Sequence, residues 1–263
     1  MNSKGTAMKN NSPITTKSGR YFLTDRIREE VNFYTTAQSE GVSPPSIQKP
    51  VPPGCRIVPL PPRGSWSIPP CDLQSAIANR ESQRRFTAES LSLDELAFLL
   101  WSTQGVRKEL HEAAVLRTVP SAGCRHPFET YLAVLRVEGL ENGIYRYLPL
   151  DNSLVFVKTV DKLAVHLTAA TRGQSFTGQA AVTFFWTVIP ERTEWRYAEA
   201  SYKVIALDAG HVCQNLYLAC EAIGAGTCAI AAYEQTLADA LLGVDGDDEF
   251  CIYIAPVGKV LKK

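Results

Sequence analysis

The stretch EASYKVIALDAGHVCQNLYLACEAI, residues 199–223, decides the fold class of this chain. It has the length of a helix, contains no proline, and places small or apolar residues on more than one side. A helix that is apolar on several sides is normally buried by the elements around it. We therefore expect a long, buried central helix, with His211 inside it as a core residue.

Strand and helix patterns alternate around this segment. The apolar run AVTFFWTVI at 181–189 is typical of a strand buried on both faces. Further strands are predicted at 129–139, 143–149, 152–160, 226–233 and 250–259, and further helices at 72–80, 92–105, 162–171 and 234–242. Ser92 and Glu95 have the spacing of a capping box at the start of the second of these helices. The order predicts an α+β fold: a mixed or antiparallel sheet flanked by helices.

The N-terminal third has a different texture. Residues 1–19 are polar and are expected to form a disordered tail, and residues 20–39 have the pattern of one helix. More than half of the 16 prolines lie between residues 44 and 70. Because proline lacks the backbone N–H, this stretch is excluded from helices and central strands and is predicted to be an extended arm. We therefore divide the chain into a tail (1–19), a helix with arm (20–70) and a folded domain (71–263).

Composition limits the functions of the chain. Its 263 residues include 27 Lys and Arg against 27 Asp and Glu, a formal net charge of zero that argues against broad binding to nucleic acid or anionic membranes. No apolar run is long enough to span a bilayer, and the N-terminus lacks a secretory pattern, so we expect a cytoplasmic protein. The seven cysteines are scattered without a CxxC pair, which favours reduced thiols in the core, and no spacing matches a metal site.

The segment RESQRRF at 80–86 follows a predicted helix. If the chain is extended there, Arg80, Ser82 and Arg84 point the same way. Two guanidinium groups and a hydroxyl suit a phosphate, because arginine binds oxyanions through paired hydrogen bonds. A solvated helix end would give a similar pattern.

Three other segments combine small residues with turns: TVPSAGCRHPFE at 118–129, GAG at 224–226 and PVGK at 256–259. Backbone without bulky side chains lets a flat ligand approach closely. The GAG segment is not a dinucleotide fingerprint, because a predicted strand follows it and the third glycine is missing. His126, within the first segment, is predicted either to approach a substrate or to pack within its loop.

The order of these motifs is similar to that of one known family. It comprises the R-x-S-x-R-x-F box, the helix end with Trp101, Gln104 and Gly105, the P-S-A-G-x-x-H-P-x-E segment, LDAGHVCQNLYLACEAIGAGTC at 207–228, and the terminal P-V-G-K. Over about residues 70–263 the chain resembles the FMN-dependent nitroreductase superfamily, and most closely its thiazole/oxazole dehydrogenase (SagB-type) branch.

The resemblance implies a nitroreductase-like homodimer with two FMN sites at the subunit interface. Arg80, Ser82 and Arg84 would hold the FMN phosphate and ribityl chain, and Lys259 after Gly258 would add a phosphate contact. Gln104 would lie near the ribityl chain or ring edge. The partner subunit would contribute the segment Pro120, Ser121, Ala122 and Gly123 against the ring, whereas backbone N–H groups near the ring would come from Gly224, Gly226 and Thr227.

One departure from the branch concerns the reaction. Azoline-oxidising members carry a Lys-Tyr pair before the long helix, where this chain has Arg196 and Tyr197. A desolvated lysine can be tuned to accept a proton near neutral pH, whereas arginine cannot. Arg196 and Tyr197 stay candidate catalytic residues together with His126, although the cofactor would supply most of the chemistry.

Three functions remain open from the sequence. The first is ping-pong transfer of electrons from NAD(P)H through FMN to a small nitro, quinone or other unsaturated acceptor. The second is FMN-dependent dehydrogenation of an azoline ring or backbone bond in a modified peptide, and the third is a non-catalytic flavin-binding partner in a modification complex.

Overall fold

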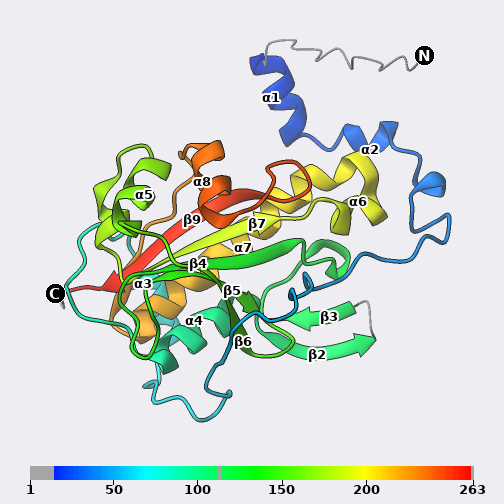
Figure 1. Cartoon of the computed structure of the whole chain (residues 1–263). Coiled ribbons are helices and arrows are strands. Elements are labelled where there is room, and N and C mark those ends of the chain that lie inside the picture. Colours follow the sequence, from blue (N-terminus) through cyan, green and yellow to red (C-terminus); the bar gives the residue numbers. More distant parts are fainter. Residues whose placement is uncertain (1–14, 112–113, 262–263) are drawn as a thin grey trace, which may run out of the picture.

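The computed structural model describes residues 15–111 and 114–261 (Figure 1). Its centre is a seven-stranded sheet with the order β1-β6-β5-β4-β7-β9-β8, in which every neighbouring pair is antiparallel. The strands are β1 (Ile57–Pro59), β4 (Phe128–Val134), β5 (Gly143–Leu148), β6 (Ser153–Lys158), β7 (Val182–Val188), β8 (Ala225–Thr227) and β9 (Phe250–Lys259). The expected α+β class is confirmed.

Strand β7 lies inside the sheet between β4 and β9, and all its residues are buried. Its side chains alternate between two hydrophobic clusters, because successive residues of a strand point to opposite faces. Phe184 and Trp186 join the cluster that also contains residues of α4 (Leu93–Gln104) and α7 (Ser201–Ala222). Phe185 joins the cluster formed with α5 (Leu163–Ala170) and α8 (Gln235–Leu242). The domain therefore has three layers, with one helix pair on each face of the sheet.

Helix α4 shows how local sequence sets an element boundary. Ser92 caps it, accepting a hydrogen bond from Glu95 N at 3.2 Å while Glu95 Oε2 accepts one from Ser92 N at 2.9 Å. The predicted capping box and the stop at Gly105 are confirmed. The shorter helix α3 (Leu73–Asn79) likewise begins after Asp72, whose carboxylate accepts a hydrogen bond from Ser75 N.

The long helix α7 is buried along one face only. Ile205, Val212 and Leu216 face the core, whereas its opposite face is exposed. The prediction that His211 is a core residue is wrong: its side chain is 49% exposed. One face of α7 is therefore exposed at the surface of the chain and is not covered by other parts of the described chain.

The predicted helix over 20–39 is wrong as a single element. The chain forms α1 (Thr16–Leu23), α2 (Ile27–Glu30) and the 3-10 turn η1 (Phe33–Thr35). Thr24 and Val31 adopt extended backbone at the two helix ends, and the Asn32 side chain accepts a hydrogen bond from Tyr34 N to begin η1. Most of the predicted tail, residues 1–14, lies outside the described residues, but residues 16–19 belong to α1.

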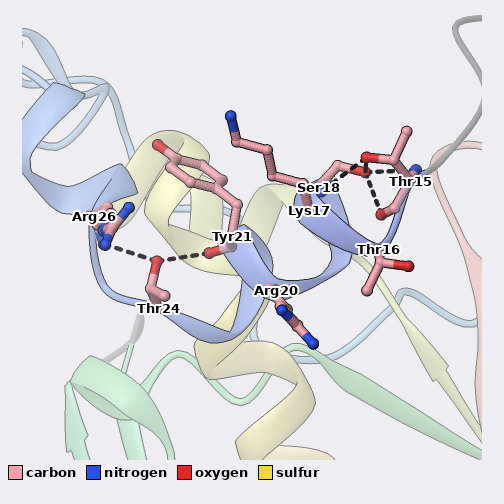
Figure 2. A pocket seen from close by; sticks show the side chains of 8 residues that line it. All are labelled: Thr15, Thr16, Lys17, Ser18, Arg20, Tyr21, Thr24 and Arg26. Atoms are coloured by element: carbon pink, nitrogen blue, oxygen red, sulfur yellow. Dashed lines mark hydrogen bonds between the residues drawn. The ribbon is translucent and has the colours of Figure 1, made fainter.

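Helix α1 has no buried residue. A cavity of about 750 Å³ lies beside it, lined by residues between Thr15 and Arg26 (Figure 2). Thr15 and Ser18 close the N-terminal turn through a reciprocal capping box. No group in this lining comes from the sheet or from α7, so the cavity belongs to the N-terminal segment alone.

The proline-rich segment is extended as predicted, and it packs on its own domain. Its strand β1 pairs with β6 at the edge of the sheet, where proline is tolerated. Ile47 and Leu60 are buried, and Trp66 packs against Phe98 and Trp101 of α4.

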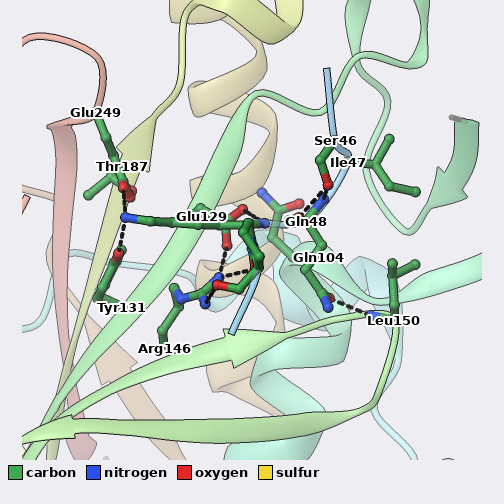
Figure 3. A network of polar contacts seen from close by, with 12 residues as sticks. Ser46, Ile47, Gln48, Gln104, Glu129, Tyr131, Arg146, Leu150, Thr187 and Glu249 are labelled. Carbon is green, nitrogen blue, oxygen red and sulfur yellow. Dashed lines mark hydrogen bonds and ion pairs between the residues drawn. The ribbon is translucent and has the colours of Figure 1, made fainter. Parts of the chain in front are cut away.

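A buried polar network fixes the segment at residues 46–50 (Figure 3). The Glu129 carboxylate on β4 accepts hydrogen bonds from Lys49 N at 2.8 Å, from Arg192 at 2.5 Å and from Arg146 at 3.1 Å. Arg146 also donates to the carbonyls of Lys49 and Pro50. Because Glu129, Arg146 and Arg192 are each less than 5% exposed, the arm is anchored in the core.

The predicted pattern lacks both a hairpin and a helix that the structure contains. The hairpin consists of β2 (Val106–His111) and β3 (Ala114–Arg117) and forms a separate two-stranded sheet. The helix is α6 (Glu191–Tyr197), which begins after Pro190 and ends before Ala198, whose φ is 44°. The predicted strand at 226–233 shortens to β8, followed by an isolated bridge at Ile230.

Within 15–111 and 114–261, no helix has the length and apolarity needed to cross a membrane.

Candidate active site

The predicted site residues form two clusters near opposite ends of α7. The cofactor cluster contains the arginine box and the glycines of β8 and β9. Ser82 forms a bridge to Thr227, Gln83 N donates to Thr227 O at 2.9 Å, and Thr87 N donates to Lys259 O at 2.8 Å. The box is therefore extended and lies along β8 and β9, which joins motifs far apart in the sequence.

Glycine is required where the box meets these strands. A Cβ at Gly226 would lie 2.4 Å from Gln83 Cγ, and a Cβ at Gly258 would lie 2.9 Å from Phe86 Cβ. Gly224 has a φ of +61°, a backbone conformation that favours glycine at the turn after α7. These glycines let the arginine box approach the sheet edge closely.

Tyr217 on α7 organises the exposed groups of the cofactor cluster. Its hydroxyl accepts a hydrogen bond from Ala229 N at 2.8 Å and lies 3.0 Å from Ser82 Oγ. The Arg80 guanidinium lies over the Tyr217 ring, 5.3 Å from its centre. Ser82 and Arg84 are exposed and Arg80 is half-buried. Tyr217 was not predicted as a site residue, and the only available signal was its place on the long helix.

The charges of this cluster suit a phosphate. Among the described residues, neither Arg80 nor Arg84 forms an ion pair. Lys259 differs, since its ammonium contacts Glu95 Oε1 at 2.5 Å and Ile223 O at 2.7 Å. The structure thus presents the two arginines and Ser82 at the surface but holds Lys259 with protein groups.

The loop cluster contains the Pro-Ser-Ala-Gly segment and the end of α6. Ala122 N donates to both oxygens of Asp208 on α7, at 3.3 and 3.2 Å. Burial raises the pKa of Asp208, although hydrogen bonds from Ser121 and Ala122 act in the opposite direction. Pro120 and Gly123 are exposed at the surface of this loop.

Gly123 brings the loop against the candidate catalytic pair. It has a φ of +58°, and a Cβ there would lie 2.7 Å from Arg196 Cδ and 2.8 Å from Tyr197 Oη. Arg196 is exposed, and its guanidinium lies 5.6 Å from the centre of the Tyr197 ring. The loop, Arg196 and Tyr197 therefore form one continuous surface, which the sequence had separated into two motifs.

Two other predicted residues point into the core. His126 is 3% exposed, and its Nε2 lies 3.1 Å from Val115 O. Burial and the nearby Arg117 lower the pKa of His126 to about 3. Of the two interpretations of His126, the structure shows loop packing. Gln104 is also buried, with its Oε1 accepting a hydrogen bond from Arg117 at 2.6 Å (Figure 3).

The two clusters are separated along α7. Asp208 belongs to the loop cluster and Tyr217 to the cofactor cluster, and at about 1.5 Å per residue they lie about 14 Å apart along the helix axis. Within one chain, the candidate catalytic pair is therefore remote from the arginines that suit a phosphate.

The chain is similar in sequence to known proteins. The profile of the nitroreductase family matches residues 77–259. The protein “Putative nitroreductase MJ1384” of Methanocaldococcus jannaschii is 30% identical over 191 residues, which are 72% of this chain and 92% of that protein. The trifolitoxin-processing protein TfxB of Rhizobium leguminosarum is 28% identical over 163 residues, which are 59% of this chain and 44% of TfxB.

Solved structures share the fold. The crystal structure of a “putative nitroreductase” from Anabaena variabilis has a TM-score of 0.65 at 27% identity, and the match covers 80% of this chain and 42% of that one. The Escherichia coli microcin synthetase McbBCD complex matches with a TM-score of 0.57 at 18% identity, over 95% of this chain and 99% of the matched chain. A Desulfovibrio desulfuricans nitroreductase structure in complex with FMN has a TM-score of 0.50 at 18% identity, over 74% and 92% of the two chains.

The family profile covers more than half of the chain, including the arginine box, both ends of α7 and the glycines of β8 and β9. The relative from Methanocaldococcus jannaschii is matched over nearly its whole length. The chain belongs to the nitroreductase family.

Proposed function

We propose that this protein is an FMN-dependent oxidoreductase that passes electrons from NAD(P)H to a small unsaturated organic acceptor. The observation that carries the proposal is the cofactor cluster: Arg80, Ser82 and Arg84 occupy alternate positions of the extended segment at the sheet edge. Among the described residues, neither arginine forms an ion pair. A phosphate there would receive charge-assisted hydrogen bonds.

The residues present fit FMN. Its phosphate suits the two guanidinium groups and the Ser82 hydroxyl, and the bare backbone at Gly224 suits a flat ring, because no atom lies within 4 Å of its Cβ position. When bound, FMN supplies the hydride and electron chemistry. The chain then needs only to bind and orient the cofactor and the acceptor. Glu95 and the Ile223 carbonyl take two of the three Lys259 ammonium donors, which leaves one for the phosphate.

We further propose a homodimer in which each FMN site uses the cofactor cluster of one subunit and the loop cluster of the other. The exposed face of α7 supports this arrangement. Its members are small, apolar or weakly polar: Tyr202, Ala206, Leu207, Gly210, His211 and Gln214. Leu207 is 55% exposed, and Gly210 has no atom within 4 Å of its Cβ position, so a second helix can pack closely there.

Two copies packed through α7 with the helices antiparallel would place Gly123 of one subunit near Arg80 of the other. Pro120, Ser121, Ala122 and Gly123 would then lie against the ring, with Gly226 and Thr227 on the cofactor side. The separation of about 14 Å along α7 would be the distance that the second subunit bridges.

A complementation experiment tests the shared site. Variant A carries Arg80→Gln and Arg84→Gln, and variant B carries Gly123→Arg; each alone is expected to lose NAD(P)H oxidation. After unfolding and refolding as a mixture, half of the dimers pair A with B, and each such dimer has one site with both clusters intact. Activity that returns on mixing supports the shared site. Activity that stays absent, while each variant still forms dimers, contradicts it.

Peptide modification is the second candidate function, because TfxB is a processing protein and the McbBCD structure holds truncated pro-MccB17. We propose it as an alternative in which Tyr197 assists proton removal from a ring or backbone bond. Tyr197→Phe should then abolish peptide oxidation, whereas turnover of quinones with NAD(P)H should persist. If Tyr197→Phe leaves peptide oxidation intact, this alternative is wrong. Bound FMN without any turnover would instead indicate a non-catalytic partner.

A further inference from the structure

A surface cavity joins the N-terminal segment to the candidate catalytic pair. It has a volume of about 310 Å³, and its walls include Arg28, Phe33, Gln38, Arg196 and Tyr197. Because Arg196 and Tyr197 also contact the Gly123 loop, the cavity opens beside the surface that the proposed flavin ring would face.

The cavity exists because the N-terminal segment is attached to α6. Gln38 N donates to Trp195 O at 2.9 Å, and Trp195 Nε1 donates to Val42 O at 2.8 Å. The Arg125 guanidinium lies 4.7 Å from the centre of the Trp195 ring on the domain side. These contacts hold Arg28 and Phe33 opposite Arg196 and Tyr197.

The charge of the cavity is positive. No carboxylate of the described residues forms an ion pair with Arg196. Arg28 contacts Asp25 through Nε at 3.0 Å, but Asp25 is outside the cavity lining. Deeper in the protein, burial lowers the pKa of Arg125, and Arg196 and Arg192 lower it further. Arg125, Arg192 and Arg196 therefore repel one another, which favours an anion beside Arg196 in a cavity whose lining, among the described residues, contains no carboxylate.

The walls of the cavity also contain two aromatic rings. The Arg28 guanidinium lies 5.7 Å from the Phe33 ring centre, and Arg196 lies 5.6 Å from that of Tyr197. Each arginine thus sits beside a ring, an arrangement that can hold an anionic group and an adjoining flat apolar group together. A volume of about 310 Å³ is at the lower end for small-molecule sites, which fits a ligand with one ring.

We propose that this cavity binds carboxylate-bearing aromatic acceptors, with Arg28 and Arg196 contacting the carboxylate and Phe33 and Tyr197 contacting the ring. The proposal rests on the proposed function in one respect, namely that acceptors reach the flavin beside Tyr197. Arg28 and Phe33 become specificity-determining residues that lie outside the region matched by the family profile.

The direct test is calorimetric titration of the full-length protein, saturated with FMN, with benzoate and with benzamide as the neutral analogue. We expect benzoate to bind with a dissociation constant of about 1 mM or lower and benzamide to bind at least about tenfold more weakly. Added NaCl should weaken benzoate binding but not benzamide binding. Inorganic phosphate, which has no ring, should bind at least about tenfold more weakly than benzoate.

Variants locate the site. Arg28→Gln should weaken benzoate binding about tenfold, and Arg28→Lys should restore part of the loss, because it keeps the positive charge. Arg26→Gln is the matched control on the same segment, since Arg26 is exposed and does not line this cavity. Equal affinity for benzoate and benzamide, equal effects of Arg28→Gln and Arg26→Gln, or phosphate binding as tight as benzoate would each overturn the proposal.

Activity assays with two acceptors distinguish a failure of the cavity proposal from a failure of the proposed function. The ratio of kcat/KM for 4-nitrobenzoate to that for nitrobenzene should fall about tenfold in Arg28→Gln, whereas turnover of nitrobenzene should stay unchanged. Protein that binds no FMN contradicts the proposed function, and the benzoate titration can still be made on that protein. Protein that reduces both acceptors without preferring the carboxylate contradicts the cavity proposal alone.

Discussion

Replacing Glu129 by Gln would remove the carboxylate that contacts two buried arginines and the backbone of the arm. Arg192 and Arg146 approach its oxygens at 2.5 and 3.1 Å, and Lys49 N donates to it at 2.8 Å. Burial would raise the pKa of Glu129, but the two arginines outweigh that effect and hold the pKa below its ordinary value. Glu129 is therefore ionised in the folded protein at neutral pH.

The expected cost of Glu129→Gln is about 3–5 kcal/mol of unfolding free energy, because the side chains of Arg146 and Arg192 are only 4% and 2% exposed and would lose their counter-charge. The matched control is Glu141→Gln. Its partner Arg56 lies at a similar 2.9 Å, but the pair is 46% and 69% exposed. A surface pair of this kind should contribute no more than about 1 kcal/mol.

Urea unfolding of both variants at one fixed protein concentration, followed by tryptophan fluorescence, measures the difference. Because the pKa of Glu129 is lowered on folding, its stabilisation is present above the unfolded pKa and is lost as the pH falls below about 4.5. The gap between wild type and Glu129→Gln should therefore narrow in acid. A Glu129→Gln cost equal to that of Glu141→Gln would refute this account of the network.

Three further predictions concern Gly123, His126 and Trp195. Gly123→Ala should cost about 1–3 kcal/mol of unfolding free energy and lower kcat/KM. In the control Gly139→Ala, where φ is +77° but no atom lies within 4 Å of the Cβ position, only the cost of left-handed backbone should appear; equal effects of the two variants would exclude the close approach of Gly123 to Tyr197. His126 should stay neutral at pH 5 by NMR, and because its pKa falls from 6.5 to about 3 on folding, up to about 5 kcal/mol of stability should be lost as the pH drops below about 6.5. A His126 ring that is already protonated at pH 5 in the folded protein would contradict its burial. Trp195→Phe should lower the unfolding free energy by about 1 kcal/mol and speed proteolysis within residues 24–42, because the hydrogen bond from Trp195 Nε1 to Val42 O is lost. An unchanged rate of cleavage would show that this hydrogen bond does not hold the N-terminal segment on α6.

The sequence predicted best the elements whose signals are local. Ser92 and Glu95 cap α4 within one turn, and β7 is a continuous apolar run, so each could be recognised without knowing its neighbours. The single helix predicted over 20–39 is wrong because two local features interrupt it. Thr24 ends α1 with extended backbone, and the Asn32 side chain accepts a hydrogen bond from Tyr34 N to begin η1. Helix α6 is too short and polar to show a clear apolar period.

The candidate site was predictable as motifs but not as geometry. Nothing local in the sequence shows that Gly123 touches Tyr197, or that Tyr217 lies beside Ser82, because these contacts join distant segments. The exposed face of α7 was misinterpreted for a related reason. The small residues beside His211, namely Ala209 and Gly210, fit a buried helix, but small residues are also compatible with the exposed face that the structure shows.

Anaerobic addition of NADH or NADPH to the purified, FMN-saturated full chain tests whether the protein passes electrons from NAD(P)H through FMN to an acceptor. We expect the bound flavin to lose its visible absorbance and to regain it when 4-nitrobenzoate or a quinone is added. We also expect Arg80→Gln combined with Arg84→Gln to weaken FMN binding by about a hundredfold or more, because two charge-assisted contacts to the phosphate are removed (about 1.5–3 kcal/mol each). Protein that retains no FMN, or bound flavin that stays oxidised with both NADH and NADPH, would contradict the proposed transfer of electrons through FMN.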